Sequence, residues 1–389
     1  MLSFTKCVLL VLALATAPVA AERECRSALL SPKTVGRVDV RVPFLPETDV
    51  FSDEIRKQVS KNAQTAPRGG SDATPTIPPA LKVTVYFALW YILNILYNIQ
   101  NKKILNALPL PLAVGTLQLG VGSTFVAMLW ATGLRKAPIL TPNGKGALKK
   151  VGFYHSAGQL LSMVSLGAGA VSFTHIVKAL EPFFSAAVSA LYLGKWMRPQ
   201  VYAALIPVVG GVATACFSDL SFTWLGFYSA MGSNLMFALR AVMSKAAMTS
   251  PIGEETTPTN VFGVVTIYSF LLALPVAFLS DWSSFGSLFR DAITSTGKSN
   301  LQFVKDICVS GLVHYLNNEV MYMALDSVHP VTLAVGNTMK RVFIIVASVI
   351  AFNTKLTTQT ITGSAVGIAG VLLYSLTKQY YEKLDAVAA

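Results

Sequence analysis

Between residues 82 and 379 the chain alternates between long apolar stretches and short polar connections. An apolar stretch of about 20 residues is long enough to cross the hydrocarbon core of a bilayer as a helix. The pattern predicts ten such helices, at 83–101, 110–132, 148–167, 170–193, 199–217, 223–248, 260–280, 303–325, 328–352 and 358–379. We therefore expect an all-α membrane protein whose ten transmembrane helices form one domain over residues 82–385.

The composition supports this fold class and argues against a nucleic-acid partner. Hydrophobic residues make up 53% of the chain, charged residues only 13%, and the mean hydropathy is +0.55. A soluble domain carries about 25% charged residues. The net charge of +12 does not indicate nucleic-acid binding, because the basic residues lie mostly in short loops between the apolar stretches.

Two segments precede the first apolar helix. Residues 1–21 have a cationic start at Lys6, an apolar core and small residues at their end, which is the pattern of a secretory signal peptide. A signal anchor is the alternative. Residues 22–81 are rich in Pro, Ser, Thr and mixed charges, which predicts a disordered, transit-like leader rather than a domain.

The two halves of the helical region carry matching features. Gln200 precedes Gly211-Val212 by the same distance that Gln359 precedes Gly370-Val371. Because five helices per half is an odd number, the two halves would have opposite orientations in the membrane. Such inverted repeats place a substrate site near the middle of the bilayer, between the halves. A chance match is the alternative.

Small residues predict where helices approach one another closely. Gly210-Gly211 forms one such point. Gly363, Gly367 and Gly370 follow at four- and three-residue steps, which places them on one helix face. We expect close helix packing at both places.

Four cations stand inside predicted helices, well away from the helix ends. Lys178 lies in the fourth predicted helix, Arg240 in the sixth, and Lys340 and Arg341 in the ninth. A cation at the centre of a membrane helix costs about 2.5–3.5 kcal/mol, so such groups normally face a partner or a water-filled cavity. A guanidinium can hold two phosphate oxygens at once, and a lysine supplies compact charge. The set therefore predicts a binding site for an anion, in particular a phosphate.

Pairing with acids is the alternative explanation for these cations. Glu181 and Glu319 are the only acids near the middle of predicted helices, so at most two of the four cations could be paired there. The remaining charge suggests a mechanism. Carrying an empty site across the membrane would enclose uncompensated cations in a medium of low dielectric constant, so strict counter-exchange is expected.

The sequence has no visible apparatus for catalysis. His155, His175, His314 and His329 lack metal-ligand spacing, so each is expected to be a hydrogen-bonded structural residue. No glycine-rich phosphate loop precedes a helix, and no nucleophile stands beside a base. The four cysteines form neither a disulfide framework nor a zinc pattern. We expect a protein that is not an enzyme and needs no metal or cofactor.

Two long motifs resemble those of the plastidic phosphate translocators. They are Lys178-Ala179-Leu180-Glu181-Pro182-Phe183-Phe184, within residues 170–184, and Val335-Gly336-Asn337-Thr338-Met339-Lys340-Arg341-Val342. The resemblance continues at 90–94 and across 233–248, so that it spans residues 82–380. The triose-phosphate/phosphate branch fits best.

This resemblance implies the drug/metabolite transporter fold, with ten helices in two inverted five-helix halves. It also implies obligatory exchange of phosphate for phosphorylated compounds. The family's phosphate-binding residues correspond to Lys178, Lys340 and Arg341, and the arginine that contacts the organic part of the substrate corresponds to Arg240.

The chain departs from the family where the organic part is recognised. Gln159 replaces the histidine usual in triose-phosphate carriers, Asn317 replaces a common tyrosine, and Ser162 is the neighbouring hydroxyl. Their side chains can still form hydrogen bonds to a hydroxyl, carbonyl or carboxylate.

We therefore expect a monomeric antiporter in a plastid envelope membrane that exchanges inorganic phosphate for triose phosphate or 3-phosphoglycerate by alternating access. Phosphoenolpyruvate is the alternative substrate, given Gln159 and Asn317. A nucleotide-sugar transporter has the same fold, and an intramembrane enzyme acting on phosphorylated lipid is the rival from another class. A signal peptide ahead of a leader resembles the targeting of algae whose complex plastid lies inside the secretory system.

Overall fold

A computed structural model describes residues 79–247, 251–327 and 330–388 of the chain. The predicted signal peptide and residues 22–78 of the predicted leader lie outside the described residues. The helices are α3 (Pro79–Ala107), α4 (Pro111–Ala131), α5 (Pro142–Ala168), α6 (Val171–Lys178), α7 (Glu181–Leu193), α8 (Pro199–Ala203), α9 (Ile206–Phe217), α10 (Trp224–Ala247), α11 (Pro258–Thr296), α12 (Asn300–Ser327), α13 (Pro330–Phe352) and α14 (Thr358–Ala388). Two short strands, β1 (Ile139–Leu140) and β2 (Gly253–Glu254), pair in antiparallel orientation.

Each predicted apolar helix coincides with one observed helix or with two consecutive ones. The stretch at 170–193 is divided into α6 and α7, and the stretch at 199–217 into α8 and α9. Pro182 and Pro207, each the second residue of the later helix, explain both breaks. Proline has no N–H, and its ring clashes with the carbonyl four residues earlier. The first break leaves Lys178 as the last residue of α6.

Seven helical segments of the described chain are long and apolar enough to cross a membrane. They are Val83–Ala107, Pro111–Ala131, Val171–Leu193, Pro199–Phe217, Pro258–Thr296, Val335–Phe352 and Thr358–Asp385. The other long helices, α5, α10 and α12, carry polar side chains such as His155, Arg240 and Glu319 along their length. The fold is therefore that of an all-helical membrane protein.

Helix α11 continues beyond its predicted end at residue 280 to Thr296. Asp281 ends the apolar run in the sequence, but it does not end the helix. Its buried carboxylate accepts a hydrogen bond of 2.8 Å from the backbone N–H of Ala113, at the start of α4. The start of a helix attracts negative charge, so the acid is satisfied without interrupting α11.

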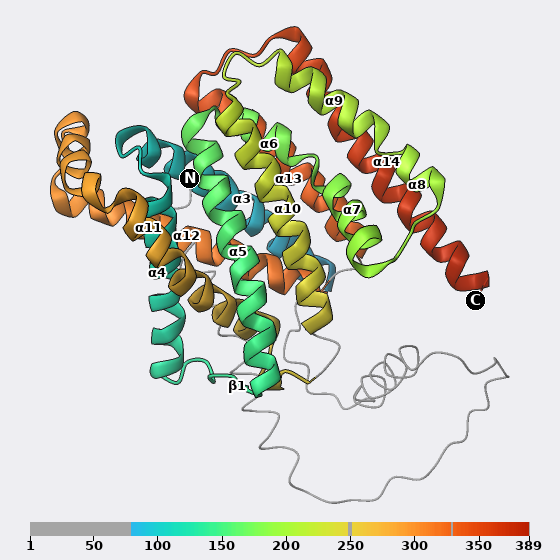
Figure 1. The fold of residues 1–389 in the computed structure, drawn as a ribbon, viewed down its shortest axis with the longest axis horizontal. Coiled ribbons are helices and arrows are strands. Elements are labelled where there is room, and N and C mark those ends of the chain that lie inside the picture. Colours follow the sequence, from blue (N-terminus) through green and yellow to red (C-terminus); the bar gives the residue numbers. More distant parts are fainter. Residues whose placement is uncertain (1–78, 248–250, 328–329, 389) are drawn as a thin grey trace, which may run out of the picture.

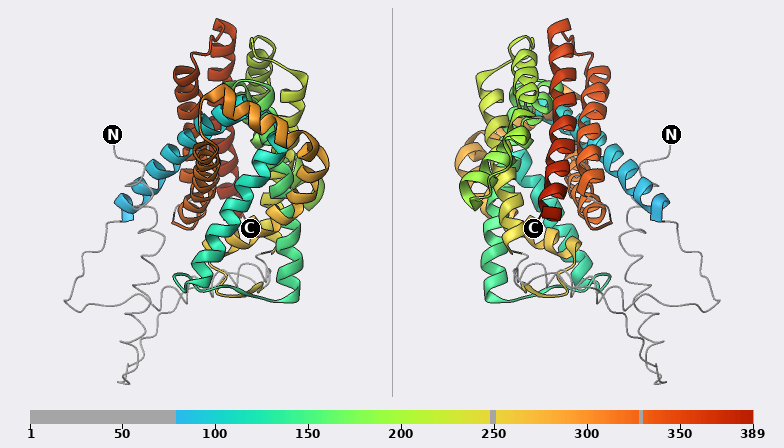
Figure 2. Two further views of the ribbon diagram at one scale, coloured as in Figure 1. Left: turned by 90° about the vertical axis from the view of Figure 1, so that its left-hand side faces the viewer. Right: turned by 90° about the vertical axis from the view of Figure 1, so that its right-hand side faces the viewer.

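Helices that pack together are mostly distant in sequence. Helix α5 lies along α10, α9 along α14, α4 along α11 and α3 along α12 (Figure 1). Figure 2 shows α3, in blue, inclined to the more upright α14, in red. The packing thus joins segments from both halves of the chain.

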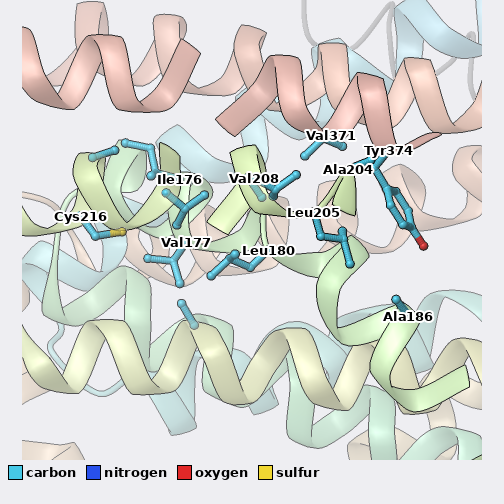
Figure 3. Close-up of a cluster of buried hydrophobic side chains, with 14 of the residues drawn as sticks. Ile176, Val177, Leu180, Ala186, Ala204, Leu205, Val208, Cys216, Val371 and Tyr374 are labelled. Carbon is cyan, nitrogen blue, oxygen red and sulfur yellow. The ribbon is translucent and has the colours of Figure 1, made fainter. Parts of the chain in front are cut away.

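Helix α6 is anchored by a cluster of buried apolar side chains (Figure 3). Ile176 and Val177 are 2% and 0% exposed, and their cluster includes Val208 of α9 and Val371 of α14. Inside a membrane, close van der Waals packing of such side chains holds neighbouring helices together. Because these residues immediately precede Lys178, their burial fixes the position of the lysine.

Glycines allow α9 and α14 to approach until their backbones touch. A methyl group at Gly363 would lie 2.6 Å from the backbone nitrogen of Ala215, and one at Gly211 would lie 2.7 Å from the carbonyl oxygen of Gly363. The predicted close packing is therefore confirmed for these two residues, and Gly370 contacts the backbone of α9 in the same way. It is wrong for Gly210, which faces outward with nothing within 4 Å of an added methyl group.

Replacing Gly211 with alanine should force α9 away from α14 and lower the free energy of unfolding by about 1–3 kcal/mol, the usual cost of adding a methyl group to a packed site. Gly210→Ala is the matched control on the neighbouring residue. Thermal unfolding of the purified variants in detergent should give a lower midpoint for Gly211→Ala than for Gly210→Ala. Equal midpoints would contradict the contact between the helix backbones.

Candidate functional site

A cavity of about 170 Å³ lies between helices of both halves of the chain. Helices α3, α5, α6, α7, α10, α12 and α13 contribute its lining. The lining residues are Trp90, Asn94, Tyr97, Asn98, His155, Gln159, Ser162, Leu166, Thr174, His175, Lys178, Glu181, Phe237, Arg240, His314, Asn317, Asn318, Met321, Asn337, Lys340 and Arg341. All seven residues predicted to contact a ligand are among them.

Lys178 reaches the cavity from the end of α6. Its ammonium donates hydrogen bonds to Ser162 Oγ at 2.6 Å and to Ser233 Oγ at 2.9 Å. The two hydroxyls lie 2.7 Å apart and so form a paired support for the lysine. An ammonium has three N–H donors, and these hydroxyls account for two of them. The ammonium is therefore held in place with a donor left for a ligand.

Lys340 and Arg341 enter the cavity in different directions from α13. Successive residues of a helix are rotated by about 100° because one turn takes 3.6 residues. Lys340 Nζ lies 4.2 Å from the ring centroid of Trp90 on α3, which is a cation–π contact. Arg341, which is 6% exposed, forms an ion pair with Glu181 at the start of α7.

Of the two acids considered as partners for the cations, only one pairs with a cation of the cavity. Glu181 pairs with Arg341, whereas Glu319 pairs with Arg135, in the loop after α4, at 2.6 Å. Both members of the second pair are almost fully buried. Among the residues that the structure describes, Arg341 is thus the only one of the four predicted cations in an ion pair. Internal pairing does not account for the other three.

Arg240 approaches from α10 and is held by two neighbours. Its Nη1 donates a hydrogen bond of 2.9 Å to Nδ1 of His155, since a guanidinium can only donate. The guanidinium also lies 5.1 Å from the centroid of the Phe237 ring, and Lys178 Nζ lies 4.8 Å from the same centroid. The Phe237 ring therefore contacts two cations.

Amides complete the polar lining. Gln159 Nε2 donates to the Tyr97 hydroxyl at 2.8 Å, and Asn94 Nδ2 donates to Asn317 Oδ1. His175 Nε2 and Asn98 Oδ1 are 2.9 Å apart. These contacts orient neutral hydrogen-bonding groups beside the four cations.

Comparison with known proteins decides the family. Residues 81–375 match the model of the Triose-phosphate Transporter family. The chain belongs to this family.

Relatives of this transporter have two kinds of substrate in their names. The chloroplastic triose phosphate/phosphate translocators of Flaveria trinervia and Pisum sativum are 40% and 41% identical, over 85% and 78% of this chain and 81% and 74% of theirs. The chloroplastic phosphoenolpyruvate/phosphate translocator 2 of Arabidopsis thaliana is 38% identical, over 81% of this chain and 82% of its own. The identities differ too little to separate the two branches.

The transporter's cavity includes side chains to which the sequence analysis assigned no binding role. Trp90, Asn94 and Tyr97 follow one another at four- and three-residue steps along α3. Such steps place residues on one helix face. This periodicity, combined with the polar character of Asn94 inside an apolar stretch, was the signal that could have found them.

The histidines were expected to be hydrogen-bonded structural residues, and the structure bears this out only in part. His175 contacts Asn98, and His155 contacts Arg240, but both also line the cavity. His314 lines the cavity too, and neither of its ring nitrogens has a hydrogen-bond partner among the described residues. The expectation is therefore wrong for His314, while His329 lies outside the described residues. His314 precedes Asn317 by three residues, a spacing that places both on one helix face.

Proposed function

We propose that this transporter exchanges inorganic phosphate for phosphorylated three-carbon compounds, triose phosphate and 3-phosphoglycerate, across a plastid membrane by alternating access. The observation that carries the proposal is the charge of the cavity lining. Four cations and one carboxylate leave a formal charge of +3 (four minus one) inside a membrane protein. A phosphoryl group carries about −1.5 to −2 at pH 7, and a carboxylate adds one more negative charge. A phosphorylated small acid therefore neutralises the lining.

The lining suggests separate roles for its residues. Lys178, Lys340 and Arg341 would bind the phosphoryl group, because a guanidinium fork and two compact ammonium groups suit its oxygens. Supporting this role, Ser162 and Ser233 orient the Lys178 ammonium, and Glu181 orients the Arg341 guanidinium.

The organic part of the substrate would contact the neighbouring groups. These are Arg240, whose guanidinium is oriented by His155, and the side chains of Gln159, Ser162 and Asn317. Charge from Arg240 suits a carboxylate, and the amides and hydroxyl suit a carbonyl or hydroxyl.

The proposal includes ten membrane-spanning helices in two inverted halves, the drug/metabolite transporter fold. The halves would be α3 to α9 and α10 to α14, with α6–α7 and α8–α9 each forming one span. A two-fold relation between halves exchanges the first span with the sixth and the third with the eighth. The observed packing of α5 with α10 (third with sixth) and of α3 with α12 (first with eighth) supports this relation. So does the packing of α4 with α11 and of α9 with α14.

The same proposal places the transporter in a plastid envelope as a monomer. The named relatives are chloroplastic proteins. A signal peptide at 1–21 followed by a leader at 22–81 would deliver the transporter domain, residues 82–385, to a complex plastid through the secretory route.

Phosphoenolpyruvate is the second candidate substrate. Gln159 and Asn317 line the cavity, and both would offer amides to the organic part of the substrate. The similarity to the phosphoenolpyruvate/phosphate translocator 2 of Arabidopsis thaliana favours this alternative. Like 3-phosphoglycerate, this compound combines a phosphoryl group with a carboxylate and would satisfy the same charge.

The test is uptake of labelled phosphate into proteoliposomes preloaded with one compound each. The compounds are phosphate, dihydroxyacetone phosphate, 3-phosphoglycerate, phosphoenolpyruvate, glucose 6-phosphate and a nucleotide sugar. We expect uptake with phosphate and the three-carbon compounds inside, with their rates ranking the substrates. Uptake supported by the nucleotide sugar but not by phosphorylated three-carbon compounds would reject the proposal.

A further inference from the structure

Two histidines lie next to each other in the cavity lining, and the proposed function gives neither of them a contact with the substrate. The rings of His155 on α5 and His314 on α12 are stacked, with centroids 6.4 Å apart and planes at 23°. Both side chains are buried, with exposed fractions of 1% and 4%, and both line the cavity. The tyrosine ring of Tyr97 covers His314 at a centroid distance of 4.9 Å.

The contact with Arg240 determines which ring nitrogen of His155 carries the hydrogen. Because the guanidinium only donates, Nδ1 of His155 must supply the lone pair that accepts the 2.9 Å hydrogen bond. The proton of a neutral imidazole is then on Nε2. Within the described part of the chain, Nε2 has no acceptor. His155 thus offers an unused N–H donor while it orients Arg240.

His314 has more unused capacity. Both its Nδ1 and its Nε2 are buried, and neither has a partner in residues 79–247, 251–327 and 330–388. A neutral imidazole presents one donor and one acceptor. A buried polar group without a hydrogen-bond partner costs about 1–3 kcal/mol. Nitrogens such as these therefore normally form hydrogen bonds to another molecule.

We infer that His155 and His314 form a hydrogen-bonding site for the oxygen-bearing end of the organic substrate. The inference rests on the proposed function and extends it. Arg240 supplies charge to a carboxylate, His155 Nε2 donates to one of its oxygens, and His314 exchanges hydrogen bonds with a neighbouring hydroxyl or carbonyl. The ligand class is therefore a short phosphorylated acid or ketose with an oxygen substituent remote from the phosphoryl group. His314 is a specificity-determining residue, and His155 is in addition a positioning residue for Arg240.

Inorganic phosphate provides an internal comparison, because it has no organic end. His314→Phe keeps a ring in place of the imidazole and removes both hydrogen-bonding atoms, whereas His314→Gln keeps a donor and an acceptor. The measurement is labelled phosphate uptake into proteoliposomes loaded with 3-phosphoglycerate, divided by uptake into proteoliposomes loaded with phosphate. We expect this ratio to fall about tenfold in His314→Phe and less than about threefold in His314→Gln, the effect of one or two lost hydrogen bonds. Cys308→Ala is the control, since Cys308 is an exposed residue of the same helix.

Two results would overturn the inference. One is an unchanged ratio in His314→Phe. The other is an equal loss with both internal substrates in both His314 variants, which is what a purely structural residue would give. Lack of phosphate exchange by the unaltered protein would instead reject the proposed function.

Ligand-induced thermal stabilisation of the purified protein in detergent tests the inference without transport. A ligand that binds the folded protein raises its unfolding temperature. The extra stabilisation by 3-phosphoglycerate over phosphate should be smaller in His314→Phe than in the unaltered protein. Equal extra stabilisation in the two proteins would overturn the inference.

Discussion

Replacing Arg341 with alanine should lower phosphate exchange by at least about thirtyfold. The Arg341 side chain is 8% exposed, whereas that of its partner Glu181 is 38% exposed. Truncating the buried member of such a hydrogen-bonded charge pair costs about 2 kcal/mol or more, and 1.4 kcal/mol corresponds to a factor of ten. Because the Arg341 side chain is buried, water would replace its contacts poorly. Its loss would also leave the Glu181 carboxylate without its ion-pair partner beside the bound phosphate. The measurement is the initial rate of labelled phosphate uptake into phosphate-loaded proteoliposomes.

Two further variants separate the charge of Arg341 from its shape. Arg341→Lys keeps the charge but not the planar fork, so we expect a loss between those of the alanine variant and the unaltered protein. Lys355→Ala removes an exposed cation from the loop after α13 and should leave the rate unchanged. Exchange by Arg341→Ala within about threefold of the unaltered rate would exclude a phosphate-binding role, because the lost charge pair predicts a far larger effect.

The second large effect is the dependence of phosphate uptake on phosphate inside the vesicle. Uptake of labelled phosphate into vesicles that contain only a buffer without phosphate should be at least about a hundredfold slower than into phosphate-loaded vesicles. When the empty transporter reorients from one side of the membrane to the other, its cavity encloses an excess of three positive charges, four cations minus one carboxylate. The cost of removing uncompensated charge from water is several kcal/mol, and each 1.36 kcal/mol in a barrier slows a step tenfold. A bound phosphate offsets this charge, so loaded carriers return quickly.

Glu181 provides a comparison for this prediction, because it is the one acid among the described residues that line the cavity. Glu181→Gln raises the formal charge of the empty cavity by one. The ratio of uptake into loaded vesicles to uptake into empty ones should therefore increase. Comparable rates into loaded and empty vesicles, for either protein, would contradict the electrostatic basis of strict exchange.

The sequence was a good guide to the helices and a weaker guide to their ends. Apolar length decides whether a segment can cross a bilayer, and each predicted segment coincides with observed helix. The break after Lys178 depends on Pro182 and on how neighbouring helices accommodate it, which a local pattern does not contain. Likewise, Asp281 looks like the end of a membrane segment until its hydrogen bond to Ala113 is seen.

For the cavity, charge was informative by itself, whereas the neutral residues Gln159, Ser162 and Asn317 were predicted only through the family resemblance. Lys178, Arg240, Lys340 and Arg341 are conspicuous because a cation inside an apolar stretch needs a reason to be there. A histidine in the same place is ordinary, so His314 could be recognised only from its unpartnered nitrogens.

The ion pairs could not be predicted because they join distant segments. Arg135 looks like an ordinary loop cation, yet it is buried against Glu319, a residue that the sequence suggested as a partner for the cavity cations. Which acid pairs with which cation depends on the packing of α4 and α12, not on either local sequence.

Equilibrium binding of labelled phosphate to the purified protein tests the central claim most directly. The claim is that the cations lining one cavity form a phosphate site. The unaltered protein should bind one phosphate per chain, and Lys340→Ala should bind it at least about tenfold more weakly, while Lys355→Ala should bind as the unaltered protein does. Equal affinity in Lys340→Ala and the unaltered protein would contradict the claim.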